Sequence, residues 1–174
     1  GHVVLGYAPV VDRQRAVAAT RLTVFPERPD ASVDGAQLQS LLAWPWQQLE
    51  GAAKGLVLPT GPVRSFINVA GEGLLRALLA AAPAPHTAIE VPAFMAADAS
   101  LAPLLAAHQA AGGTLVLKGA AREALPAAVA GCFAACIDDG GGAPAVAGLP
   151  RLRDGVTAPR DLAAALAAGA TAAL

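Results

Sequence analysis

This sequence has little charge, few aromatic side chains and few cysteines, and the first of these shortages excludes a class of protein. Only 14% of its 174 residues are charged and the net charge is −1, so we expect no clustered basic face and no nucleic-acid polymer as a partner. The chain has no stretch of about 18 uninterrupted apolar residues, which argues against a transmembrane helix and a membrane partner. Its first residues also lack the basic and apolar regions of a secretory signal.

The two cysteines, Cys132 and Cys136, stand four positions apart around the expected start of a strand. In a strand this spacing separates the two residues by about 13 Å, which is too far for a disulfide. No partners for a metal ion surround them. We therefore expect both to be reduced core residues of a cytoplasmic protein. The abundance of alanine suits a bacterial genome rich in G and C, which is a compositional observation only.

Short apolar segments alternate with stretches that are long enough for helices. Hydrophobic residues make up 55% of the chain, and such a composition indicates a folded domain. Two strands over residues 3–11 and 16–25 are expected to form an antiparallel hairpin. Further strands are expected over 55–59, 65–69, 87–91, 114–118, 133–138, 152–156 and 170–174. Helices are expected over 71–82, 98–111, 121–130 and 159–168, with another after Asp34 that Trp44-Pro45-Trp46 interrupts.

Repeated β-α units of this kind build parallel sheets whose strands are buried on both faces. The predicted fold class is therefore α/β, a compact TIM-like β/α barrel that begins with an antiparallel hairpin. A full eightfold barrel typically needs about 250 residues, so a chain of 174 residues leaves open whether the barrel is complete.

A polar residue stands at the end of four of the apolar segments: Asn68, Glu90, Lys118 and Asp138. In a β/α barrel the C-terminal ends of the strands form the face on which active sites are built. We therefore expect these four side chains to converge in one mouth, where acids and a cation face each other.

The order and spacing of these segments resemble the EAL family of cyclic-diguanylate phosphodiesterases in a degenerate form, and especially the type found beside HDOD domains. Residues 7–13 and 19–22 are similar to the family's opening hairpin, 66–69 to its Asn-bearing strand and 88–92 to its first Glu strand. Residues 113–117 are similar to the strand before its Asp-Asp pair, 136–138 to its Lys-Ile-Asp strand, and 153–157 with 162–169 to its Glu-Gly-Val-Glu segment and the following helix. The resemblance covers nearly the whole chain and implies one EAL-type domain over residues 1–174, with or without further domains in a larger protein.

The departures from the family pattern fall on its functional positions. The Glu that gives the family its name is Arg21 here, and Lys118-Gly119 replaces the Asp-Asp pair. Cys136 stands for the Lys of Lys-Ile-Asp, while the acids of Glu-Gly-Val-Glu have become Asp154 and Thr157. The helix that normally follows the Lys-Ile-Asp strand is largely missing, which also puts the family's mode of dimerisation in doubt.

Phosphodiester hydrolysis on this fold would need one or two divalent cations held by oxygen ligands. The oxygen-bearing side chains left at the mouth are Asn68, Glu90, Asp138 and Asp154. Arg21 and Lys118 bring two fixed positive charges, and an ammonium about 4 Å from a divalent ion is repelled by about 8 kcal/mol at an effective dielectric of 20. We therefore expect no metal, cofactor or catalytic residue, and expect the two cations to pair with the acids.

These residues predict a catalytically inactive EAL-like module that regulates or binds a protein partner or an adjacent signalling domain. One alternative is a sensor in which Arg21 and Lys118 grip a cyclic dinucleotide, bound weakly and without metal, or another anion. A second alternative is a barrel enzyme that uses Lys118 as a Schiff-base lysine. Under the first two interpretations the residues of the vestigial site are those named above: Arg21, Asn68, Glu90, Lys118, Asp138 and Asp154.

Overall fold

The chain begins with a long antiparallel hairpin, as its sequence predicts. The structure, a computed structural model, describes residues 3–28, 34, 36, 38, 54–140 and 146–174. β1 (Val3–Asp12) pairs with β2 (Val17–Pro26), with one irregularity of register after Val10. The turn between them is held by Asp12, whose Oδ1 accepts hydrogen bonds from the backbone N–H groups of Gln14 and Ala16, each at 2.9 Å.

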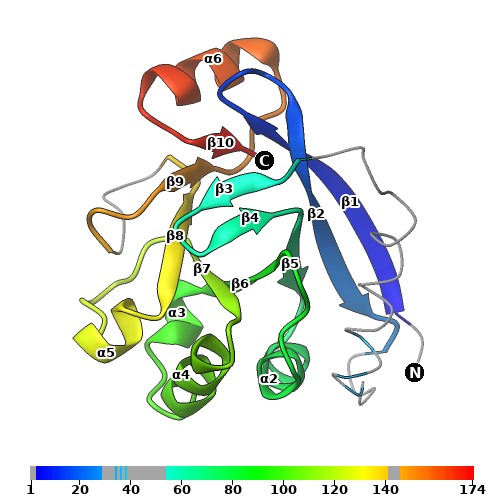
Figure 1. The fold of residues 1–174 in the computed structure, drawn as a ribbon, viewed down its shortest axis with the longest axis vertical. Helices are drawn as coiled ribbons and strands as arrows, with labels where there is room; N and C mark the ends of the chain where they lie inside the picture. Colours follow the sequence, from blue (N-terminus) through cyan, green and yellow to red (C-terminus); the bar gives the residue numbers. More distant parts are fainter. Residues whose placement is uncertain (1–2, 29–33, 35, 37, 39–53, 141–145) are drawn as a thin grey trace.

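Eight strands close into a barrel in the order β1-β10-β9-β8-β7-β6-β5-β2 (Figure 1). The six strands after the hairpin are β5 (Ser65–Val69), β6 (Thr87–Pro92), β7 (Thr114–Lys118), β8 (Phe133–Asp138), β9 (Arg151–Arg153) and β10 (Ala172–Ala173). Neighbouring strands run parallel except where β1 meets β2 and β10. The fold is thus a closed TIM-like barrel with an N-terminal antiparallel hairpin, and the shortness of the chain does not leave it open.

The described helices are short, which allows a chain of this length to close a barrel. The described helices are α2 (Glu72–Ala80), α3 (Ala93–Ala96), α4 (Ala102–Ala110), α5 (Ala127–Ala130) and α6 (Pro159–Ala167). In the connection from β8 to β9, the described residues 139–140 and 146–150 contain no helix. The helix expected after Asp34, with its break at Trp44-Pro45-Trp46, lies largely outside the described residues. Of the described helices, none is long and apolar enough to cross a membrane.

One helical prediction needs correction, and one short helix was not predicted. The helix expected over residues 121–130 is reduced to α5, which begins only after Pro126. Proline lacks a backbone N–H and restricts the residue before it, so a helix cannot run through this position without a break. The short helix α3, which follows β6 directly, had no expected counterpart.

Apolar clusters line both sides of the barrel wall. The inner apolar cluster takes residues from all eight barrel strands and from the small hairpin of β3 (Leu56–Leu58) and β4 (Gly61–Val63). The outer apolar cluster packs the strands against α2, α3, α4 and α5. Both cysteines are buried, free thiols in the outer apolar cluster, as expected.

The β3–β4 hairpin covers the end of the barrel where the parallel strands begin. Thr60, in the turn of this hairpin, lies with its Oγ1 2.9 Å from Oγ1 of Thr114, the first residue of β7. The backbone N–H of Gly55 also donates to the carbonyl oxygen of Ala18 near the start of β2. The C-terminal ends of the parallel strands therefore form the mouth.

Candidate functional site

Strand alternation decides which polar side chains reach the mouth, because successive residues of a strand point to opposite faces. Glu90 of β6 lies between Ile89 and Val91, which both belong to the outer apolar cluster. Its side chain therefore points into the barrel. The same reasoning places Arg21, which precedes Leu22, and Lys118, which follows Leu117, inside the barrel.

Arg21 holds two carboxylates at the centre of the mouth. Its Nε lies 3.1 and 2.9 Å from the two carboxylate oxygens of Glu90, and Nη2 also donates to Oε1 of that residue. Its Nη1 donates to Oδ1 of Asp154 at 2.8 Å. The expected ion pairs of Arg21 are confirmed, and we call Arg21, Glu90 and Asp154 the mouth cluster.

Burial strengthens the attraction between the charges of the mouth cluster. The side chain of Glu90 is 0% exposed, that of Arg21 11% and that of Asp154 30%. Desolvation alone would lower the pKa of Arg21, but the hydrogen bonds and attraction of Glu90 and Asp154 outweigh it and raise that pKa above its ordinary value. The guanidinium is therefore a permanent positive charge between two carboxylates.

The sequence predicted that Lys118 would contact Glu90 or Asp138 directly or through one water, and the structure shows no direct ion pair with either acid. The Nζ of Lys118 instead donates to Oδ1 of Asn68 at 2.5 Å. Asn68 in turn places its Nδ2 3.4 Å from Oγ1 of Thr23 on β2. The expectation considered only carboxylates as partners, whereas the parallel register of β5, β6 and β7 also brings the amide of Asn68 within reach of the lysine.

The environment of Lys118 disfavours its charged form. Desolvation is the largest effect and lowers the pKa of the ammonium. The attraction of Glu90 and Asp154 raises it and the repulsion of Arg21 lowers it, and the balance leaves the pKa of Lys118 below its ordinary value.

Asp138 lies on the other side of the wall, so its predicted place in the mouth is wrong. Its neighbour Ile137 belongs to the inner apolar cluster, and the alternation of β8 therefore turns Asp138 outward. There one carboxylate oxygen lies 2.9 Å from Nη2 of Arg151 and the other lies 3.2 Å from Nε of Arg153. We call these three residues the β8–β9 ion pairs.

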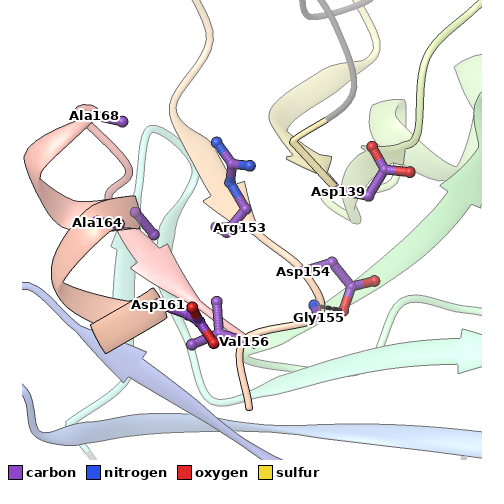
Figure 2. A pocket seen from close by; sticks show the side chains of 9 residues that line it. Asp139, Arg153, Asp154, Gly155, Val156, Asp161, Ala164 and Ala168 are labelled. Carbon is purple, nitrogen blue, oxygen red and sulfur yellow. Dashed lines mark hydrogen bonds between the residues drawn. The ribbon is translucent and has the colours of Figure 1, made fainter. Parts of the chain in front are cut away.

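A cavity of about 380 Å³ lies beside the mouth, between α6 and the segment that follows β9 (Figure 2). Its lining includes Asp139, Arg153, Asp154 and Asp161, together with a small apolar set: Gly155, Val156, Ala164, Ala165 and Ala168. Asp154 thus takes part in both the mouth cluster and this cavity. Sequence reasoning missed Asp139, Arg153 and Asp161, although the alternation of β8 could have separated Asp139 from Asp138.

The backbone conformation at Gly140, which follows Asp139, favours glycine. Its φ of 91° is in the region that favours glycine, and a Cβ at this position would collide with Nη1 of Arg153. The backbone N–H of Gly140 donates to Oδ1 of Asp138 at 3.0 Å. A side chain at position 140 would therefore strain the backbone and displace the end of the Arg153 side chain.

The residues at the mouth do not fit a centre for divalent cations. Both carboxylate oxygens of Glu90 accept hydrogen bonds from Arg21, so a cation bound to them would have to displace the guanidinium. Throughout the part of the chain that the structure describes, no group of three or more His, Cys, Asp or Glu side chains could hold a metal ion.

Solved structures of EAL proteins have a similar fold. One is the PaMucR phosphodiesterase in complex with c-di-GMP, which is 14% identical, with a TM-score of 0.59 over 98% of this chain and 88% of that one. Another is the EAL domain of Mycobacterium smegmatis DcpA, 15% identical, with a TM-score of 0.56 over 99% of this chain and 89% of that one. A third is Klebsiella pneumoniae BlrP1 with calcium and c-di-GMP, at 13% identity and a TM-score of 0.62; the match covers 98% of this chain but only 53% of BlrP1.

At these identities the likeness establishes the fold alone, and the fold is an EAL-type TIM-like barrel. No protein-family model matches the chain, and no curated protein matches it either. What the mouth does must therefore be argued from its own residues.

Proposed function

We propose that this chain is a catalytically inactive, degenerate EAL-like domain that serves c-di-GMP signalling in a bacterial cytoplasm as a regulatory or protein-interaction module. Its fold is shared with the PaMucR phosphodiesterase and with BlrP1, which were both solved with c-di-GMP. Its partner would be another protein or an adjacent signalling domain, such as the HDOD domain of the type it resembles.

The observation that carries this proposal is the position of Arg21. Its guanidinium occupies the space between Glu90 and Asp154, where carboxylates facing one another could otherwise share a cation. Positive charge is thus supplied by the chain itself. Replacing Arg21 by a metal would require the breaking of a buried ion pair, and removing one partner of such a pair costs about 3–5 kcal/mol.

The same geometry weakens the case for Arg21 as a grip for an anionic ligand. Each of its three side-chain nitrogens already donates to a carboxylate. A phosphate would have to compete with Glu90, whose side chain is 0% exposed. Of the two cations that the sequence places at the mouth, Lys118 would remain to bind a cyclic dinucleotide, and a weak affinity is the most that we expect.

Exposed aromatic side chains at the mouth end favour a protein partner. Phe25, near the end of β2, is 45% exposed, and Phe94, in the helix that follows β6, is 77% exposed. Exposed aromatic side chains are typical anchors of protein interfaces. They suit a partner domain that covers this end of the barrel.

Hydrolysis and binding measurements with c-di-GMP test the proposal. Purified protein with Mg²⁺ or Mn²⁺ should give no turnover, since a permanent guanidinium occupies the centre of the mouth. Calorimetry with and without Mg²⁺ should show weak binding at most, and no dependence on the metal. Turnover that disappears in Glu90→Ala, in a variant shown to be folded by circular dichroism, would overturn the proposal.

A further inference from the structure

The sequence contains two lysines, Lys54 and Lys118, and the structure gives them different surroundings. Lys54 is exposed and precedes the β3–β4 hairpin at the closed end of the barrel. Lys118 is partly buried at the end of β7, with its Nζ inside the mouth. The chain therefore contains its own reference for the chemical behaviour of an ordinary lysine.

A neutral amide, and not a carboxylate, holds the amine of Lys118. Nζ donates to Oδ1 of Asn68, while Glu90 and Asp154 are already engaged by Arg21. A carboxylate in direct contact would stabilise the ammonium, whereas an amide oxygen does so less strongly. Desolvation and a nearby cation are the two conditions under which a lysine becomes a nucleophile. Both apply to Lys118, because its side chain is partly buried and the guanidinium of Arg21 repels its ammonium, and both effects lower its pKa.

We propose that Lys118 is a nucleophilic amine that forms an imine with small neutral aldehydes at the barrel mouth. The end of a barrel strand, where Lys118 lies, is the position at which barrel enzymes carry reactive groups. The proposal goes beyond the proposed function, because it concerns the reactivity of one side chain and requires neither hydrolysis nor a protein partner.

The reaction is a condensation that needs no external oxidant or reductant. The lone pair of the neutral amine adds to the carbonyl carbon, and the carbonyl oxygen takes up a proton to give a carbinolamine. Loss of water then forms the carbon–nitrogen double bond. Both hydrogens of the amine leave with the carbonyl oxygen as water, and addition of water reverses the sequence.

The charges of the mouth select neutral carbonyl compounds over anionic ones. When Lys118 is neutral, the mouth cluster contains one positive group, Arg21, and two negative groups, Glu90 and Asp154. A negatively charged 2-oxo acid would be repelled by this excess, whereas an uncharged aldehyde would not. The ratio of labelling at Lys118 to labelling at Lys54 should therefore be higher with propanal than with pyruvate.

Reductive trapping compares the two lysines in one sample. Folded protein at pH 7 is treated with propanal and cyanoborohydride, which reduces an imine to a stable secondary amine. An arginine-specific protease separates Lys54, between Arg28 and Arg64, from Lys118, between Arg76 and Arg122. Mass spectrometry should show Lys118 labelled several-fold faster than Lys54, and in urea the two lysines should react at the same rate.

Two variants separate this reactivity from simple accessibility. Asn68→Asp keeps the shape of the side chain but places a carboxylate against the amine, so labelling of Lys118 should fall toward the rate of Lys54. Lys54→Arg should leave the rate at Lys118 unchanged. Equal rates at the two lysines in folded wild-type protein, or an undiminished rate at Lys118 in folded Asn68→Asp, would overturn the proposal. A ratio of Lys118 to Lys54 labelling that is as high with pyruvate as with propanal would contradict the selection of neutral carbonyls.

Discussion

Arginine and carboxylate side chains meet on both sides of this barrel wall. Inside, Glu90 is 0% exposed and Arg21 satisfies both of its oxygens. Outside, Asp138 has two arginine partners, Arg151 and Arg153, whose side chains are 36% and 25% exposed. The mouth cluster thus depends on a single cation, whereas the β8–β9 ion pairs share two that water reaches. Burial and redundancy, and not the presence of an ion pair, decide what each contributes to stability.

Removal of an arginine should give the largest difference in stability between the mouth cluster and the β8–β9 ion pairs. Arg21→Ala leaves Glu90 as an uncompensated buried charge and should reduce the free energy of unfolding by about 3–5 kcal/mol. Arg151→Ala is the matched control: it leaves Arg153 with Asp138 and should cost about 1 kcal/mol or less. Urea denaturation followed by circular dichroism measures both. Equal losses of unfolding free energy in the two variants would show that burial inside the barrel does not distinguish the mouth cluster from the β8–β9 ion pairs.

Added salt should change the coupling energies of the mouth cluster and the β8–β9 ion pairs differently, and this difference should be smaller. The Debye length falls from about 10 Å at 0.1 M salt to about 3 Å at 1 M, and exposed pairs are screened far more than buried ones. A double-mutant cycle on Arg151 and Asp138 should give a coupling energy that nearly vanishes in 1 M NaCl. The cycle on Arg21 and Glu90 should keep most of its coupling. Loss of both couplings in salt would contradict the burial of the mouth cluster.

The smallest expected effect is a pH dependence of stability that comes from His108, which belongs to neither the mouth cluster nor the β8–β9 ion pairs. His108 is 4% exposed, and its Nδ1 lies 3.1 Å from the carbonyl oxygen of Leu79. Burial lowers the pKa of His108 below 6.5, against the opposing effect of backbone hydrogen bonds. The unfolded chain therefore binds more protons as pH falls below about 6.5, and stability should decline there.

Urea denaturation at a series of pH values from 5 to 8 tests this contribution. His108→Gln should flatten the decline below about pH 6.5 and have no effect on the pH dependence above it. A variant that keeps the full decline would show that other groups cause it. The two ion-pair groups are best compared above this range, where His108 contributes no pH dependence.

The sequence predicted the positions of the strands better than it predicted which side chains point into the barrel. The bounds of β7 and β8 agree with their expected ranges because each is a short apolar run that ends in a charged residue. Asp138 was misplaced because its position at a strand end was considered without the alternation of β8, which Ile137 reveals. The partner of Lys118 was missed because an amide on β5 competes with the acids, and this depends on register rather than on composition.

The central claim is that Arg21, with Lys118, stands where a cation would be needed, and Mn²⁺ binding tests it most directly. Electron paramagnetic resonance of free Mn²⁺ can be recorded for the wild type, Arg21→Glu, Lys118→Asp and the double variant. We predict no binding by the wild type or by either single variant, because Arg21→Glu leaves the Lys118 amine, and Lys118→Asp leaves the Arg21 guanidinium, in the place of an oxygen ligand, and measurable binding by the double variant. Binding of Mn²⁺ by the wild type that is lost in Glu90→Ala, or no binding by a folded double variant, would contradict this account.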